Sequence, residues 1–169
     1  MQLKISTDYA IRAILYLAVK KEIISSNQIS EEMGIPGKYL INLSTKLRKA
    51  GLIHTHQGKH GGYTLARPPE KISVYDILLA MGDTIKINRS LEADGNRSRA
   101  GEKFGQLRRF YRLTQEKMEQ YFKCFTIADL MADMDEKEML IRIELGDSYH
   151  QMRHASSQRA EIIEGTYQS

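Results

Sequence analysis

The chain has 169 residues, a formal net charge of +4 and one cysteine. That length fits one domain with a core of its own, together with an appended element. No apolar run reaches the roughly 18 residues of a membrane span. A lone Cys124 excludes an internal disulfide framework and favours a reducing, cytoplasmic location.

The charge is unevenly distributed along the chain. Residues 1–69 hold 10 Lys or Arg against 4 Asp or Glu, whereas residues 70–169 hold 15 against 17. A basic N-terminal half favours a polyanion-binding surface, and a near-neutral remainder favours assembly or sensing. Uneven surface charge without any partner is the alternative.

Three helices are expected in the first 50 residues. Apolar residues at helical spacing predict a helix over 7–20, with Ser6 or Thr7 as its N-cap. The stretch "SSNQISEEMG" predicts a short second helix that stops at Gly34, and "PGKYLINLSTKLRKAG" predicts a third that ends at Gly51. Two helices joined by a tight turn of this kind form a helix-turn-helix.

The third helix has the pattern of a DNA-recognition helix. Leu40, Leu43 and Leu47 form an apolar stripe, and polar residues fall on the opposite side. No acid occurs in residues 36–50, and Asn42 offers an amide able to read a base edge. Ordinary solvation of an amphipathic helix is the alternative.

A β-hairpin is expected directly after the third helix. "LIHTH" and "YTLA" alternate apolar and polar residues, and "QGKHGG" between them is a glycine-rich turn. A helix-turn-helix followed by such a hairpin is a winged helix, so the predicted fold is mainly α with a small β-hairpin wing. His54, His56 and His60 lie here, but no Cys, Asp or Glu is near enough to complete a metal site, so none is expected.

These patterns together predict a DNA-binding surface on the second helix, the third helix and the wing. The predicted contacts are Ser26, Gln28, Lys38, Tyr39, Asn42, Lys46, Lys49, Gln57, Lys59 and His60.

The second half of the chain contains a long helix. Ser73 has capping-box spacing to Asp76 for a short helix that ends at Gly82, and a polar loop over 83–101 follows. A helix from near Glu102 to about Lys123 carries large side chains at 3–4 spacing, as in a coiled-coil seam. The seam favours a homodimer, with packing across its own domain as the alternative. The predicted seam residues are Phe104, Leu107, Tyr111, Met118 and Tyr121.

The resulting domain organisation has four parts. Residues 1–82 form the winged helix-turn-helix, 83–101 a sensor-type loop, and 102–134 the dimerisation helix with a short helix after it. Residues 135–169 form a charged tail that can be disordered, within which "EMLIRIEL" suits either a strand or a helical turn.

Three stretches resemble one family. "STDYAIRAILYLA", "IPGKYLINLSTKLRKAGLI" and "GKHGGYTLARPPEKISVYDILLAM" are similar to the IscR/NsrR/CymR family of bacterial winged-helix regulators, over roughly residues 1–133. The resemblance implies a homodimeric transcription regulator, usually a repressor, on a pseudo-palindromic operator of double-stranded DNA. Several members of the family sense iron–sulfur status, nitric oxide or redox state.

The resemblance also implies where an iron–sulfur cluster would be held. Members with a cluster bind it through cysteines in the loop before the long helix, and some add an acid from the first helix, at the position of Asp8. Here Ala93, Ala100 and Gly105 stand about where those cysteines are expected. No cofactor is therefore expected in this chain, although a form with cysteines in the loop could carry a cluster. A cluster-free regulator that responds to a small molecule or a protein partner is the alternative.

Other function classes have less support in the sequence. No nucleophile elbow, glycine-rich phosphate loop or pair of carboxylates is present, so an enzyme is not expected. A winged helix that binds an acidic protein partner is the third class. The salt dependence of duplex binding separates it from a DNA-binding regulator.

Overall fold

A computed structural model of the protein describes residues 3–82, 105–146 and 148. The chain divides into two compact units, Met1–Ala132 and Asp133–Ser169. The elements of the first unit in chain order are α1 (Ile5–Lys20), α2 (Ser26–Met33), α3 (Gly37–Lys49), β1 (Ile53–His56), β2 (Gly62–Leu65), the 3-10 turn η1 (Pro69–Lys71), α4 (Val74–Met81), α6 (Gly105–Cys124) and α7 (Ile127–Met131). This arrangement confirms the predicted class, mainly α with one antiparallel hairpin.

Helix α1 lies at the centre of the first unit and begins earlier than predicted. Its N-cap is Lys4, which makes no side-chain capping bond, so the prediction of Ser6 or Thr7 as the cap is wrong. Thr7 is completely buried inside the first turn, because packing on the core extends the helix past the local capping signal. Helix α1 ends where Lys21 adopts a left-handed conformation with φ 55°.

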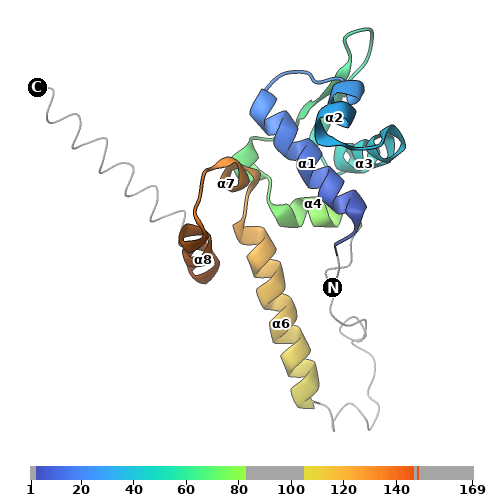
Figure 1. The fold of residues 1–169 in the computed structure, drawn as a ribbon. Helices are drawn as coiled ribbons and strands as arrows, with labels where there is room; N and C mark the ends of the chain where they lie inside the picture. Colours follow the sequence, from blue (N-terminus) through green and yellow to red (C-terminus); the bar gives the residue numbers. More distant parts are fainter. Residues whose placement is uncertain (1–2, 83–104, 147, 149–169) are drawn as a thin grey trace, which may run out of the picture. The chain divides into compact units, whose positions relative to one another are not determined.

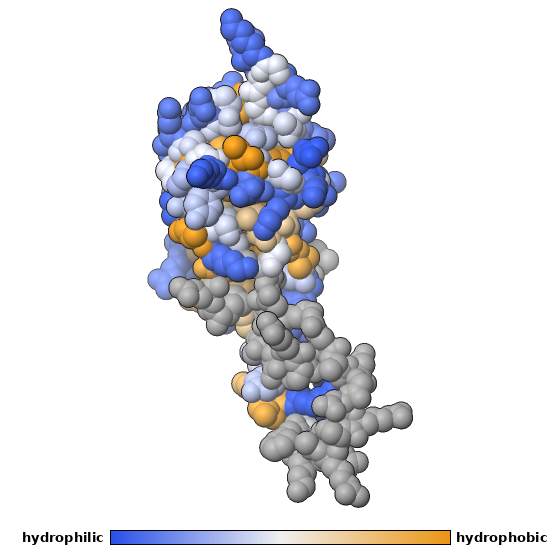
Figure 2. Space-filling model, turned by 90° about the vertical axis from the view of Figure 1, so that its right-hand side faces the viewer, coloured by the Kyte–Doolittle hydropathy of each residue, from blue (hydrophilic) through white to orange (hydrophobic). Residues whose placement is uncertain are grey.

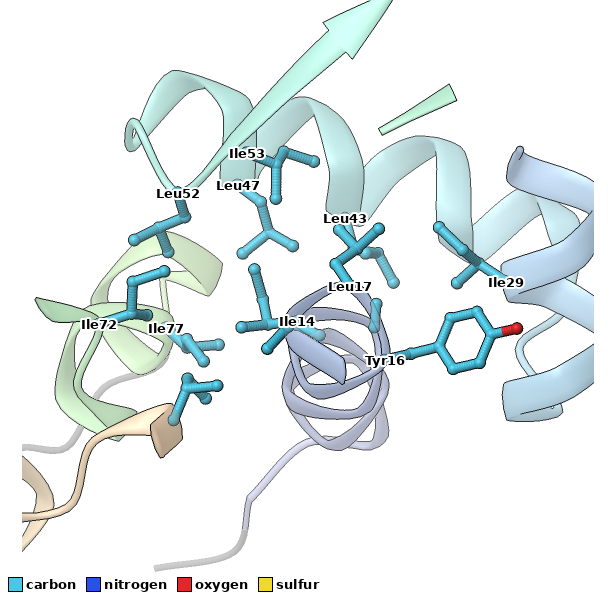
Figure 3. Packing of buried hydrophobic residues seen from close by; sticks show 14 of the residues in the cluster. Ile14, Tyr16, Leu17, Ile29, Leu43, Leu47, Leu52, Ile53, Ile72 and Ile77 are labelled. Atoms are coloured by element: carbon cyan, nitrogen blue, oxygen red, sulfur yellow. The ribbon is translucent and has the colours of Figure 1, made fainter. Parts of the chain in front are cut away.

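The helix-turn-helix packs on α1 through the expected apolar residues (Figure 3). Ile14 and Leu17 of α1 meet Leu43 and Leu47 of α3, with Ile77 of α4 beside them. All five are at most 3% exposed, and each such side chain contributes about 1.5–3 kcal/mol on burial. The core therefore fixes which side of α3 remains at the surface.

The hairpin has the predicted strands and turn. Strand β1 pairs antiparallel with β2, with Ile53 opposite Leu65 and His56 opposite Gly62. Tyr63 also exchanges two backbone hydrogen bonds with Ile24, at 3.1 and 2.9 Å, in the connection between α1 and α2. The hairpin is thus attached to the helix-turn-helix along one strand as well as at its base.

Helix α4 connects the winged helix to the later elements. The capping box of Ser73 and Asp76 is confirmed in both directions, and Gly82 ends the helix with φ 71°. Ser73 also forms a bridge with Thr126, the N-cap of α7, whose own capping box uses Asp129. These backbone contacts join residues about 50 positions apart, which no local sequence pattern predicts.

Helix α6 is the long helix of the predicted seam. Its described part runs from Gly105 to Cys124, about 30 Å at 1.5 Å per residue. The predicted loop over 83–101, its residues Ala93 and Ala100, and the seam residue Phe104 lie outside the described residues. Among the described residues, none of the helices combines the length and the apolar character that a membrane crossing requires.

The second unit contains α8 (Glu136–Leu145). Asp135 caps it by accepting a hydrogen bond from the Glu138 amide at 2.8 Å. The segment "EMLIRIEL", which suited a strand or a helical turn, is therefore part of a helix of 10 residues.

Candidate nucleic-acid interface

One side of α3 is an exposed polar stripe. Because Leu40, Leu43 and Leu47 face the core, the residues about half a turn away must face outward. By helical periodicity these are Lys38, Asn42, Thr45 and Lys49, and all four are exposed. We call these four residues the α3 stripe. Thr45 belongs to the stripe by its position on the helix, although it was not among the predicted contacts.

Tyr39 and Lys46 lie on the flank of α3 that is turned toward other helices. The Tyr39 ring meets the ring of Tyr9 in α1 edge to face, at 5.8 Å between centroids. The ammonium group of Lys46 donates a hydrogen bond to the carbonyl oxygen of Met81, in the last turn of α4, at 3.0 Å. Both residues are exposed, yet both already contact neighbouring helices.

The opposite flank of α3 borders a groove against the hairpin. Its volume is about 580 Å³. The residues that line it are Ile41, Ser44, Thr45, Arg48, His54, Thr55, Gln57 and Tyr63. At the bottom, Ser44 donates to the Tyr63 hydroxyl oxygen at 3.1 Å, so the helix and the hairpin are joined by a side-chain hydrogen bond. Arg48 was not among the predicted contacts, because it lies beside the α3 stripe rather than on it.

The hairpin carries the three histidines in different settings. His54 is exposed, whereas the His56 ring nitrogen Nε2 is 2.9 Å from the Thr64 hydroxyl across the strands. His60 lies in the turn with Gln57 and Lys59, and all three are exposed. No group of three or more potential metal ligands gathers within the part of the chain that the structure describes. The hairpin tip, at the top of the molecule in Figures 1 and 2, is covered by hydrophilic side chains.

Ser26 and Gln28 lie in the first turn of α2, beside the N-cap Ser25. The Ser25 hydroxyl oxygen accepts a hydrogen bond from the Gln28 amide at 3.2 Å. The side-chain amide of Gln28 donates to the Tyr16 hydroxyl at 3.3 Å and is thereby directed toward α1. Ser26 remains exposed at the helix N-terminus, where backbone N–H groups favour an anion.

The surface formed by these elements is basic. Between Glu32 and Glu70 the sequence has no acidic residue, and this stretch includes all of α3 and the hairpin. The ten predicted contact residues are all exposed, although Gln28, Tyr39 and Lys46 also contact neighbouring helices. An exposed basic helix next to a basic hairpin has the shape and charge of a nucleic-acid interface.

The predicted seam residues on α6 differ in how much the first unit covers them. Leu107 and Tyr121 are 44% and 43% exposed, and Tyr111 and Met118 are half-buried. Phe110, which the spacing did not select, is 61% exposed. Within one chain, α6 thus presents large apolar side chains to solvent.

Asp8 and Cys124, the two residues relevant to a cluster, are engaged elsewhere. The Asp8 carboxylate pairs with Arg12 one turn later in α1 at 2.8 Å. Cys124 is buried at the end of α6, where its thiol donates to the Tyr121 carbonyl oxygen at 3.0 Å. Gly105 is the first residue of the described part of α6.

A helix-turn-helix with a β-hairpin wing and a basic exposed helix defines the winged-helix class of DNA-binding regulators. Residues 3–133 match the Rrf2 family, described as iron-dependent transcriptional regulators, and the chain belongs to this family. This confirms the resemblance to IscR- and NsrR-type regulators.

Individual relatives give the extent of the similarity. The chain is 28% identical to the regulator NsrR of Halalkalibacterium halodurans over 85% of this chain and 99% of that protein. It is 35% identical to a helix-turn-helix-type regulator of Mycobacterium tuberculosis, over 46% of this chain and only 50% of that protein. The solved structure of T. potens IscR shares 27% identity with a TM-score of 0.56, covering 81% of this chain and 90% of that one. The relatives are transcription regulators and not enzymes, in agreement with the sequence interpretation.

Proposed function

We propose that the protein is a homodimeric, sequence-specific DNA-binding transcription repressor that inserts α3 into the major groove of a pseudo-palindromic operator. The observation that carries the proposal is the exposed, acid-free α3 stripe beside a basic hairpin. The major groove is wide enough for one α-helix, and its base edges present distinct donor and acceptor patterns. Membership of a transcription-regulator family supports the same function.

Within this surface the residues have different tasks. The Asn42 amide can form two hydrogen bonds with an adenine edge, and Lys38 and Lys49 can neutralise phosphates on either side. Lys59 and His60 at the hairpin tip suit the minor groove or the adjacent backbone. Ser26 at the N-terminus of α2 suits a further phosphate contact.

A dimer accounts for the apolar side chains of α6. Two copies related by a two-fold axis would place two α3 helices on successive major grooves, which is why a pseudo-palindromic operator is proposed. Leu107, Phe110 and Tyr121 would lose their exposure to water in such an interface. Binding of a dimer at a promoter excludes other proteins from that site, which is repression.

The donor set of this chain does not fit a thiolate-bound iron–sulfur cluster. The sequence holds one cysteine, and that thiol is buried at the end of α6. Ala93, Ala100 and Gly105 offer no ligand atoms in their side chains, and the Asp8 carboxylate is paired with Arg12. This favours a regulator without a cluster, which responds to a small molecule or a protein partner, over direct sensing of iron–sulfur, nitric oxide or redox state.

A pair of variants tests DNA recognition by this surface. An operator is first selected by the wild type from a pool of random duplexes, and binding is measured by fluorescence anisotropy against salt concentration. Asn42→Ala should cost about 1–3 kcal/mol on that operator and much less on unrelated duplexes. Lys59→Ala should weaken binding to all duplexes alike. It should also lower the salt slope, the slope of the logarithm of the binding constant against the logarithm of the salt concentration, by about 1 in magnitude. If both variants keep wild-type affinity and slope, the assignment of this surface is wrong.

The cofactor question has a separate test. Protein purified without oxygen is analysed for visible absorption, iron and sulfide. A colourless protein that still binds its operator is the expected result. Stoichiometric iron and sulfide with visible absorption bands would show that ligands other than cysteine hold a cluster.

A further inference from the structure

We propose that the groove between α3 and β1 holds one backbone phosphate of the bound DNA, with Arg48 and His54 as its donors from the two walls. The inference rests on the proposed DNA binding and extends it to two residues outside the predicted contact set. It assigns to the groove a ligand, the phosphodiester, that differs from the base edges proposed for the α3 stripe.

Two nitrogen-bearing side chains line the groove, one from each wall. Arg48 comes from the last turn of α3, and His54 comes from the second position of β1. Both are exposed, and both line the same groove of about 580 Å³. Within the described ranges, no hydrogen bond or ion pair engages the guanidinium group of Arg48 or the His54 ring. Their donors are therefore available to a ligand in the groove.

The walls of the groove are held at a fixed separation. Ser44 of α3 donates to the Tyr63 hydroxyl oxygen, and Tyr63 is itself anchored by two backbone hydrogen bonds to Ile24. Ser44 is only 5% exposed, so this link lies at the base of the groove rather than at its rim. Because the backbone of the two walls is linked in this way, the entropy cost of binding falls mainly on the Arg48 and His54 side chains.

The charge of the groove selects an anion. None of the eight lining residues is acidic, and the forked donors of an arginine guanidinium match the oxygens of a phosphate. Thr45, Thr55 and Gln57 add further polar groups along the rim. An anion gains both hydrogen bonds and charge attraction from Arg48, whereas a cationic ligand would be repelled.

The position of the groove identifies the phosphate as part of the DNA backbone. The residues that line the groove include Thr45, which is also a member of the α3 stripe, and residues of the hairpin. If the stripe faces base edges in the major groove, the space between helix and wing must lie along the sugar–phosphate ridge that borders it. A backbone phosphate is the anion that is present there in every sequence.

The test is a salt titration of binding to a mixed-sequence duplex of about 30 base pairs. Arg48→Met keeps the aliphatic stem and should lower the salt slope by about 1 and weaken binding about tenfold. Lys71→Met removes one charge from η1, outside both the groove lining and the predicted contact set, and should change the affinity less than about twofold. His54→Ala should weaken binding, and His54→Gln, which keeps an N–H donor, should restore most of the loss. Thermal melts followed by circular dichroism confirm that each variant is folded.

The double variant Arg48→Met, His54→Ala tests whether one phosphate is shared. If both residues donate to one phosphate, their losses of binding free energy should not add. The double variant should then bind DNA nearly as tightly as whichever single variant binds less tightly. Fully additive losses would mean separate phosphates and would overturn the proposal. If Arg48→Met matches Lys71→Met while the wild type binds with a steep salt dependence, the groove assignment fails and the proposed function stands. If the wild type shows no salt-dependent duplex binding, the proposed function itself fails.

Discussion

Lys46 joins α3 to α4 through Met81, which comes 35 positions later in the sequence. Its ammonium group donates to the Met81 carbonyl oxygen, one of the carbonyls at the C-terminus of α4 that lack a partner within the helix. A cation at this end also interacts favourably with the helix dipole. Lys46 was predicted as a DNA contact, and in the free protein its ammonium group is used to position α4 against α3.

This geometry predicts different effects for two lysines of α3. Lys46→Met should lower the free energy of unfolding by about 1 kcal/mol, because it removes a charged hydrogen bond at a helix end. Lys49→Met, on the α3 stripe, should leave stability within about 0.5 kcal/mol of wild type but lower the salt slope of DNA binding. Urea unfolding and duplex titration of both variants check this. An unchanged stability of Lys46→Met together with a reduced salt slope would instead make Lys46 a DNA contact.

At the scale of elements, the hairpin depends on a close backbone approach at Gly62. A Cβ atom at this position would clash with the backbone carbonyl of Ile24. The same approach allows the two hydrogen bonds between Ile24 and Tyr63. Because backbone atoms cannot move away as a flexible side chain could, only glycine fits here.

Gly62→Ala should therefore destabilise the protein by about 1–3 kcal/mol, because the hairpin must move away from the connection between α1 and α2. Gly37→Ala is the matched control, since no atom lies within 4 Å of its added Cβ and the residue belongs to a helix. The control should be neutral or more stable by up to about 1 kcal/mol. Thermal unfolding of both variants measures the difference, and equal melting temperatures would contradict the role of Gly62.

A polar cluster attaches α6 to α4. Glu119 of α6 accepts hydrogen bonds from Gln115 at 2.9 Å, from the Tyr75 hydroxyl of α4 at 3.2 Å and from Lys123 at 3.4 Å. The Lys123 ammonium also lies 4.5 Å from the centre of the Tyr75 ring. The hydrogen bond from Gln115, followed by those from Lys123 and Tyr75, lowers the pKa of the Glu119 carboxyl below its usual value against the opposing effect of burial.

The lowered pKa has a predictable effect on stability. A carboxyl with a lower pKa in the folded protein stabilises it above the unfolded pKa of about 4.3, and this stabilisation is lost as pH falls through the folded value. The difference in unfolding free energy between wild type and Glu119→Gln should therefore shrink on acidification from about pH 6 to pH 3. Tyr75→Phe, which removes one donor, should show a weaker pH dependence than wild type. Urea unfolding at several pH values tests this, and a constant difference would contradict it.

At the scale of the whole molecule, the exposed apolar side chains of α6 predict a dimer. Two chains of 19.4 kDa should give a light-scattering mass near 39 kDa. Met118→Glu would place an unpaired carboxylate in the seam at a cost of several kcal/mol and should yield the monomer at micromolar concentration. Gln120→Glu introduces the same charge at an exposed position about half a turn away and should leave the dimer intact. A dimer mass for Met118→Glu would show that this seam is not the interface.

The sequence by itself determined the class of fold, because the signals involved are local. Helical and alternating periodicities, the Ser73 capping box and the glycines after the helices act within a few residues, and the structure has those elements. The absence of acids between Glu32 and Glu70 likewise marked the basic surface.

The tertiary structure decided which side of each element is used and what it faces. Helix α1 begins at Ile5 and not at the predicted residue 7, because packing that buries Thr7 outweighs a local capping preference. Lys46 and Arg48 are two residues apart on α3, yet one contacts α4 and the other lines the groove beside the hairpin. The groove exists because Ser44, Tyr63 and Ile24 are joined by hydrogen bonds over 19 and 39 positions of sequence. Contacts at such separations depend on how the core packs, and no pattern within a single helix or strand encodes them.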